Sequence, residues 1–258
     1  MQYIVPIISG KGGVGKSTVA ANLAVSLAAL GYKTALLDCD LYGPSIPTLF
    51  GGGAISPDHE GKIIPAEKFG VKYISIGFFL HNPDDPVIWR GPMFNKAINQ
   101  LFNDVSWGVV DICIVDMPPG TGDAQLSLAQ SLKLTGALAV TTPQEVALAD
   151  VRKSLNMLKK VNVPVLGLIE NMAGFKLPNG ETVNIFGEGG GKKTADDFGI
   201  EFFGSIPLVA DIREGGDNGN PIATDHNSDS AKIFRTFAER LVNILKESEN
   251  QGPVIVNS

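Results

Sequence analysis

Residues 10–17 constrain the fold of this chain more than any other segment. They read Gly-Lys-Gly-Gly-Val-Gly-Lys-Ser and fit the phosphate-loop pattern G-x-x-x-x-G-K-S/T. In such a loop the glycines let the backbone point its N–H groups at phosphate oxygens, the lysine reaches the β- and γ-phosphates, and the hydroxyl binds Mg²⁺. The residues expected to contact the phosphates and the metal are Gly10, Gly12, Gly13, Val14, Gly15, Lys16, Ser17 and Thr18.

The segments on either side of the loop support this interpretation. Residues 3–8 form a short apolar run typical of a buried parallel strand. Residues 17–30 have the apolar spacing of a helix and are followed by the stop signal Gly31. A strand, a glycine-rich loop and a helix in this order place the helix N-terminus against a bound anion. A second lysine, Lys11, follows the first glycine and indicates a deviant form of the motif.

Apolar runs and helical patterns alternate along the whole chain. This alternation predicts an α/β fold, a doubly wound and mainly parallel sheet with helices on both faces. The strands are expected at residues 3–8, 33–38, 71–76, 109–115, 136–141, 164–169 and 202–206. The helices are expected at residues 16–30, 93–104, 123–132, 145–160, 189–198 and 229–247. Residues 43–70 are richer in Gly and Pro, and we expect an irregular segment there with a short hairpin around Gly61 and Lys62.

Composition limits the domain count and the partners. A chain of 258 residues with 44% hydrophobic content can bury one large core, so we expect a single ATPase-sized domain over residues 1–250 and a tail at 251–258. The net charge of −6 gives no global attraction for nucleic acid, and none is expected as a partner. We also expect no transmembrane segment, no targeting segment and a cytoplasmic location, because no long apolar stretch occurs.

Carboxylates follow two of the expected strands. Asp38 and Asp40 close the strand at 33–38, and Asp116 closes the strand at 109–115. Ligands in such sheets bind at the carboxyl ends of the strands, so these side chains are expected beside the Mg²⁺ of a nucleotide. One can orient the metal shell and another can position an attacking water. Residues 118–122, Pro-Pro-Gly-Thr-Gly, then form a candidate switch that senses the γ-phosphate.

Taken together, residues 11–18, 37–45 and 116–123 resemble the deviant Walker A ATPases, and within them the Mrp/NBP35 branch of iron–sulfur cluster carrier and assembly proteins. Further segments fit the same branch in the same order: residues 89–92, 142–145, 170–172, 185–191 and 205–208. The resemblance covers residues 1 to about 245. It implies a P-loop NTPase fold of the MinD/NifH type and slow, Mg-dependent ATP hydrolysis by a nucleotide-switched dimer.

The resemblance also implies a role for each site residue. Lys16 and the loop amides hold the phosphates, and Ser17, Asp38 and Asp116 lie at the Mg²⁺. Lys11 is expected to reach the nucleotide of the partner subunit, and Asp40 to position the hydrolytic water. Asn171 is expected to read the adenine edge, and the backbone around Pro207 to flank the base.

One part of the family pattern is missing. Members of this branch carry Cys-Pro-x-Cys shortly after Asn-Met, and two such pairs bridge a 4Fe–4S cluster between subunits. Here Leu177 and Gly180 replace the two cysteines, and neither residue can ligate iron. Cys39 and Cys113 both lie in apolar, strand-like runs, where we expect buried side chains.

These observations leave two functions open. The first is an ATPase of iron–sulfur cluster assembly or transfer, acting on client proteins as a homodimer or as a heterodimer with a cysteine-bearing paralogue. The second is a MinD/ParA-like switch that binds a membrane, DNA or a protein surface without any cluster. The last helical segment has an apolar stripe formed by Phe234, Phe237, Leu241 and Leu245, which is expected to pack on the sheet rather than lie on a membrane.

Overall fold

The computed structural model describes residues 1–41, 43–79, 91–177 and 179–250. The expected tail at 251–258 lies outside these ranges, as do Trp89 and Arg90 of the motif at 89–92 and Pro178 between Leu177 and Gly180.

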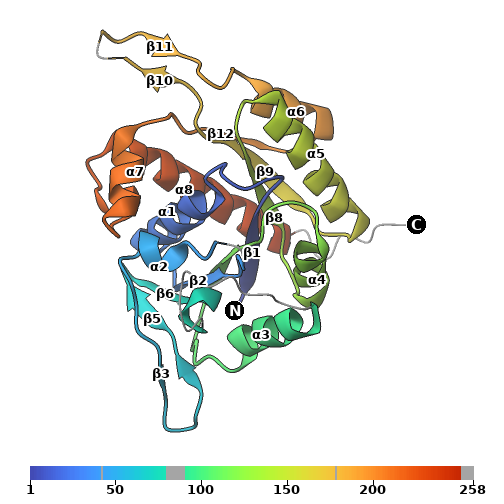
Figure 1. Cartoon of the computed structure of the whole chain (residues 1–258), viewed down its shortest axis with the longest axis vertical. Helices are drawn as coiled ribbons and strands as arrows, with labels where there is room; N and C mark the ends of the chain where they lie inside the picture. Colours follow the sequence, from blue (N-terminus) through green and yellow to red (C-terminus); the bar gives the residue numbers. More distant parts are fainter. Residues whose placement is uncertain (42, 80–90, 178, 251–258) are drawn as a thin grey trace.

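An eight-stranded sheet forms the centre of the molecule (Figure 1), in the order β12-β9-β8-β1-β7-β2-β6-β5. All neighbouring strands are parallel except β5, which runs antiparallel to β6 at one edge. The strands of this sheet are β1 (Tyr3–Ser9), β2 (Thr34–Asp38), β5 (Ala66–Lys68), β6 (Val71–Ser75), β7 (Ile112–Asp116), β8 (Ala137–Thr141), β9 (Val165–Glu170) and β12 (Phe202–Ser205).

Helices cover both faces of the sheet, because alternate residues of its buried strands point to opposite sides and each side needs an apolar cover. One face packs against α1 (Lys16–Ala29), α2 (Ile46–Leu49), α7 (Ala210–Asp217), the short 3₁₀ helix η2 (Ile222–Thr224) and α8 (Asp229–Asn250). The other face packs against α3 (Gly91–Asn103), α4 (Asp123–Ser131), α5 (Glu145–Lys160) and α6 (Gly190–Phe198). The expected doubly wound α/β architecture is therefore confirmed.

All seven predicted strands and all six predicted helices are present. The largest shifts are at the start of β7, which begins at Ile112 rather than at 109, where Val109 is exposed, and at the end of α8, which extends to Asn250 rather than to 247. The predicted hairpin around Gly61 is formed by β3 (Ser56–Pro57) and β4 (Ile63–Ile64). The segment 43–70 is more regular than expected, because it also contains α2 and β5.

Outside the segment 43–70, four further features were not predicted from the sequence. They are α7, the 3₁₀ helices η1 (Ile76–Phe79) and η2, and a second hairpin of β10 (Phe175–Lys176) and β11 (Thr182–Val183). The two hairpins project from opposite ends of the molecule (Figure 1).

The last helix packs as expected. Phe234, Phe237, Leu241 and Leu245 of α8 are at most 3% exposed and belong to the same core as α1 and the sheet. This apolar stripe is therefore not available to a membrane surface. In the described part of the chain, no helix has the length and apolar character of a bilayer span.

Candidate functional site

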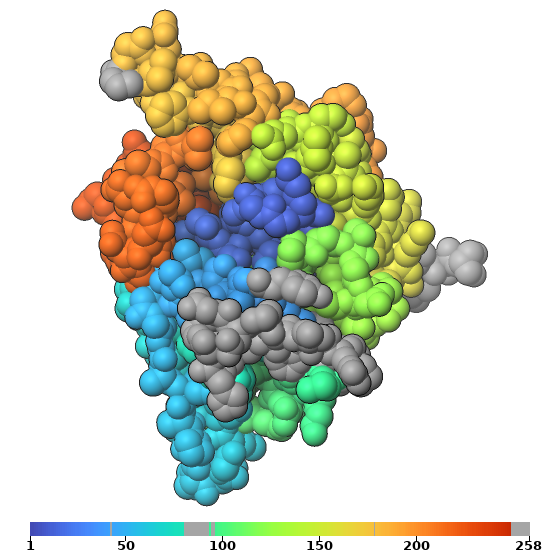
Figure 2. Space-filling model, viewed as in Figure 1, coloured from blue at the N-terminus to red at the C-terminus, as the bar shows by residue number. Residues whose placement is uncertain are grey.

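The phosphate-binding loop joins β1 to α1 and has the conformation that its glycines predict. Gly13 and Gly15 have φ values of 80° and 84°, a region in which side chains are strained. A Cβ on Gly10 would lie 2.2 Å from the backbone carbon of Asp150, and a Cβ on Gly15 would lie 2.1 Å from Nδ2 of Asn171. The loop is therefore packed between α5 and the end of β9, and glycine is required at both contacts. Figure 2 shows this N-terminal segment at the centre of one face of the molecule.

Lys16 joins the loop to the predicted carboxylates. Its side chain is only 6% exposed, and its Nζ lies 2.5 Å from Oδ1 of Asp116 and 3.3 Å from Oδ2 of Asp40. Burial alone would lower the pKa of Lys16, but the charges of Asp116 and Asp40 outweigh it and raise the pKa above its ordinary value. Lys16 is therefore a permanent cation that holds two strand ends together at the base of the loop.

The carboxylates lie in one row across the sheet. Asp38 of β2 is in register with Asp116 of β7 on one side and with Ser75 of β6 on the other. All three side chains are completely buried. Burial, together with the neighbouring charge of Asp116, raises the pKa of Asp38 to about 7. The parallel register thus brings together residues that are far apart in the sequence.

Asp38 is held by three hydrogen-bond donors. Its Oδ2 accepts from Ser75 Oγ at 2.8 Å and from the backbone N–H of Ile46 at 3.2 Å. Its Oδ1 accepts from the backbone N–H of Asp40 at 3.1 Å. Sequence reasoning missed Ser75, and its only signal was a polar residue inside the apolar run 71–76.

Asp116 offers a carboxylate oxygen that could ligate a magnesium ion. Its Oδ2 is buried and has no hydrogen-bond partner among the described residues, while its Oδ1 faces Lys16. Burial raises the pKa of Asp116 and the charge of Lys16 opposes that shift. The hydroxyl of Ser17 is adjacent, since Lys16 Nζ lies 3.4 Å from it. A carboxylate oxygen and a hydroxyl, with phosphate oxygens to complete the shell, are the hard ligands that Mg²⁺ takes.

Two cavities open on either side of the loop and share part of its wall. The first, of about 460 Å³, is lined by Lys11, Lys16, Ser17, Asp40 and Pro119, among others. The second, of about 580 Å³, adjoins it at Gly15 and Thr18 and extends toward α7. A groove that begins at phosphate-binding amides and continues into a larger, partly apolar cavity has the layout of a nucleotide site.

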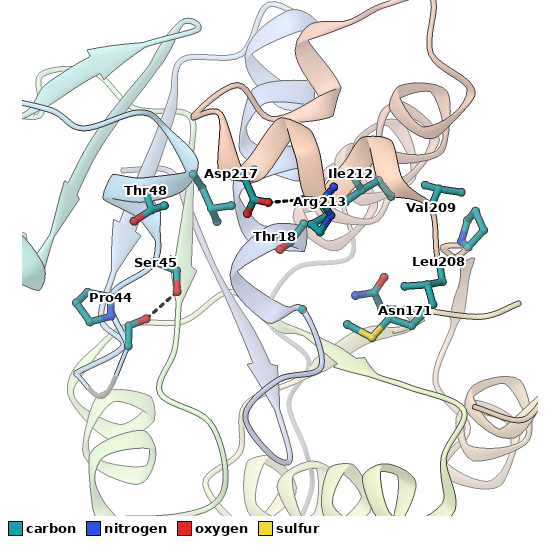
Figure 3. A pocket seen from close by; sticks show the side chains of 16 residues that line it. Thr18, Pro44, Ser45, Thr48, Asn171, Leu208, Val209, Ile212, Arg213 and Asp217 are labelled. Atoms are coloured by element: carbon teal, nitrogen blue, oxygen red, sulfur yellow. Dashed lines mark hydrogen bonds and ion pairs between the residues drawn. The ribbon is translucent and has the colours of Figure 1, made fainter. Parts of the chain in front are cut away.

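The residues expected at the base, Asn171 and Pro207, both line the second cavity. Figure 3 labels Asn171 in this cavity. Asn171 is buried, and its Nδ2 donates to the carbonyl of Val14 in the loop at 2.9 Å. The opposite wall comes from α7, where Arg213 pairs with Asp217 at 2.6 Å. This wall was not predicted from the sequence, because the two consecutive glycines Gly215 and Gly216 disfavour a helix and α7 was not expected there.

The candidate switch is tied to the loop and to α5. The N–H of Gly120 donates to the carbonyl of Ser9 at 2.9 Å, and Ser154 Oγ of α5 donates to the carbonyl of Gly120 at 3.3 Å. Gly120 has a φ of 88°, which glycine tolerates best. Pro119 of this segment also lines the smaller cavity, so the candidate switch lies beside the phosphate-binding loop.

The two positions of the missing cysteines lie in the turn of the β10–β11 hairpin. The N–H of Gly180 donates to the carbonyl of Leu177 at 2.9 Å, so the two positions are close together. Cys39 and Cys113 are completely buried, as expected. Burial raises the pKa of Cys113 to about 12 and that of Cys39 well above its ordinary value. Neither thiol is positioned to replace the missing pair.

Comparison with known families gives a match over almost the whole chain. Residues 1–242 match the family model described as NUBPL iron-transfer P-loop NTPase. Among curated proteins, the chain is 50% identical over 254 residues to the iron–sulfur cluster carrier protein of Aquifex aeolicus, covering 97% of this chain and 70% of that protein. It is 44% identical over 263 residues to the iron–sulfur cluster transfer protein NUBPL of Dictyostelium discoideum, covering 97% and 80%.

Solved structures agree with this result. A nucleotide-binding protein of Archaeoglobus fulgidus in complex with ADP is 39% identical, has a TM-score of 0.77, and is matched over 90% of this chain and 91% of that one. MinD of Pyrococcus horikoshii in complex with Mg-ADP is 24% identical with a TM-score of 0.68, over 98% and 100%. This second likeness shows a common fold.

Proposed function

This chain belongs to the NUBPL iron-transfer P-loop NTPase family, and from that premise we propose that it binds and hydrolyses MgATP as a dimer in iron–sulfur cluster assembly or transfer. The observation that carries the proposal is the buried contact of Lys16 with Asp116 and Asp40 at the base of the phosphate-binding loop. The names of the relatives at 44–50% identity support the cluster-related role.

Nucleotide binding is proposed to use the two adjoining cavities. The loop amides from Gly10 to Thr18 and the ammonium of Lys16 hold the phosphates in the smaller cavity. The base enters the larger cavity between α7 and Asn171, with Pro207 at its edge. An Asn side chain can pair with the donor and acceptor on one edge of adenine.

Magnesium is proposed to bind between Ser17 and the buried Oδ2 of Asp116. When bound, it would neutralise charge on the phosphate oxygens. Asp38 lies in the same row, and its two oxygens already accept three hydrogen bonds. We therefore propose a supporting position for Asp38 rather than direct coordination.

Hydrolysis is proposed to depend on Asp40. Its carboxylate lines the phosphate cavity next to Lys16, where it can accept a hydrogen bond from the attacking water and orient it toward the γ-phosphorus. Lys11 also lines this cavity, and in a dimer its charge would stabilise the leaving phosphates of the partner's nucleotide.

Two variants test the proposal in steady-state ATPase and nucleotide-binding assays. Lys16→Ala is expected to abolish both, because the phosphates lose their buried counter-charge and Asp116 loses its partner. Asp40→Ala is expected to retain ATP binding, to lower turnover roughly a hundredfold or more, and to accumulate an ATP-bound dimer in gel filtration. Asp58→Asn, at an exposed hairpin, is the control. Normal turnover by Asp40→Ala contradicts the assigned role.

The cluster itself is proposed to come from elsewhere. Because Leu177 and Gly180 cannot ligate iron, we propose that a cysteine-bearing paralogue or a client supplies the thiolates. Anaerobic reconstitution followed by iron quantification and visible absorption tests this. A stoichiometric 4Fe–4S signal from the chain alone would contradict it. The cytoplasmic location stays a prediction.

A further inference from the structure

Asp40 lies on the loop that follows β2, and the backbone of this loop is fixed by Asp38. One oxygen of Asp38 accepts the N–H of Asp40, and the other accepts the N–H of Ile46, where α2 begins. A single buried carboxylate therefore ties both ends of the segment 40–46 to the end of β2. The position of the Asp40 side chain over Lys16 depends on these two hydrogen bonds.

Asp38 in turn depends on Ser75. The Oγ of Ser75 donates to Oδ2 of Asp38 at 2.8 Å, and it accepts the N–H of Gly77 at 3.0 Å. A serine hydroxyl has only one proton, and the Gly77 N–H supplies a proton of its own, so the Ser75 proton is directed to Asp38. Since Ser75 is completely buried, no bulk water can replace this donor if it is removed.

The electrostatic setting makes this donor important. Asp38 is in register with the buried carboxylate of Asp116, and it has no direct contact with Lys16 comparable to the 2.5 Å contact of Asp116. Its three hydrogen bonds therefore hold the carboxylate of Asp38 in one orientation. Without Ser75, Oδ2 keeps only the longer bond from Ile46, and the carboxylate can rotate away from the neighbouring charge.

We propose that Ser75 is a positioning residue for ATP hydrolysis, which acts through Asp38 to hold the Asp40 loop where Asp40 can orient the attacking water. This inference rests on the proposed function and deepens it. Ser75 is not among the residues that line the phosphate or the base cavity in the described structure, so it should affect turnover and not nucleotide contact. A misplacement of about 1 Å at a catalytic group can lower the rate roughly a hundredfold.

The test compares Ser75→Ala with Ser75→Thr, which keeps the hydroxyl. Ser75→Ala is expected to lower kcat roughly tenfold to a hundredfold, while KM for ATP and the Kd of a fluorescent ATP analogue change less than about twofold. Ser75→Thr is expected to regain most of kcat. Ser26→Ala, a buried serine of α1 remote from the row of carboxylates, is the matched control and keeps the wild-type rate.

A second measurement separates positioning from general damage to the fold. In the Asp40→Ala background, Ser75→Ala should cause no further loss of kcat, because the Asp40 carboxylate that Ser75 is proposed to position is already absent. An additional tenfold loss in the double variant would overturn the inference, as would an unchanged kcat for Ser75→Ala or an equal loss of kcat and ATP affinity. If the wild-type protein itself shows no turnover, the proposed function fails and this inference fails with it. If the wild type turns over and Ser75→Ala has the same kcat, only this inference fails.

Discussion

At the scale of single residues, negative charges outnumber positive ones around Lys16. One ammonium lies against two carboxylates, and a third carboxylate, Asp38, is in the adjacent strand. Burial raises the pKa of Asp38, and the negative charge of Asp116 raises it in the same direction. Lys16 offsets only part of the negative charge of the three carboxylates, so they form an electronegative row at the end of the sheet.

The buried thiol of Cys113 gives a prediction about pH. Burial raises its pKa to about 12 in the folded chain, whereas the pKa of an unfolded thiol is about 9. The folded state therefore retains a proton that the unfolded state releases, and this stabilising contribution is complete below pH 9 and is lost as the pH rises from 9 toward 12. Near pH 8 the native protein should leave Cys39 and Cys113 unmodified by iodoacetamide. The protein unfolded in urea should react with iodoacetamide at both cysteines. Rapid labelling of the native protein would contradict the burial described here.

Single residues also show what the sequence could and could not predict. Lys16, Asp40 and Asp116 could be proposed as site residues from the sequence, because each belongs to a motif. Ser75 was not, because its meaning depends on the register of β6 with β2 and no local pattern encodes a register. Arg213 was missed for a similar reason, since it reaches the base cavity only through the packing of α7.

At the scale of elements, α8 shows how an apolar stripe is used. Phe234 is completely buried and makes an edge-on contact with Phe237 against α1 and the sheet. Phe234→Ala is expected to lower the free energy of unfolding by about 3–5 kcal/mol, through lost burial and the cavity that remains. Arg235→Ala, on the exposed face of the same helix, should change it by less than about 0.5 kcal/mol. Urea unfolding measures both. Equal effects would mean that the stripe is not part of the core.

Elements differ in how clearly the sequence encodes them. The buried parallel strands and the long helices were predicted to within a few residues, because their apolar periodicity is set by burial on one or both faces. Short elements such as α2, β5 and β10 are formed by packing and by turns. With only two to four residues each, they are too short to show a periodic spacing of apolar residues. The glycines of α7 disfavour a helix in an isolated peptide, but the segment is helical in the folded chain because tertiary contacts outweigh this preference.

At the scale of the whole molecule, the two positions where the resemblance leads us to expect cysteines lie together in the hairpin at one end of the molecule. Leu177 and Gly180 face each other across one hairpin turn. The double variant Leu177→Cys, Gly180→Cys is expected to bind about two iron atoms per chain after anaerobic reconstitution, the content of one 4Fe–4S cluster shared by two chains. Gly180 has a φ of 88°, so the cysteine there will also lower stability somewhat. The single variants are the controls. Equal iron in the wild type would show that the chain binds a cluster by other residues.

The root of this hairpin lies beside the wall of the base cavity. The N–H of Ala173 donates to the carbonyl of Ile206, and the N–H of Leu208 donates to the carbonyl of Gly174, each at 2.9 Å. Met172 and Leu208, directly beside these bonds, are walls of the base cavity. The cavity wall and the foot of the hairpin are therefore joined directly by two backbone hydrogen bonds, so a substitution at Ala173 or Gly174 acts on both at once.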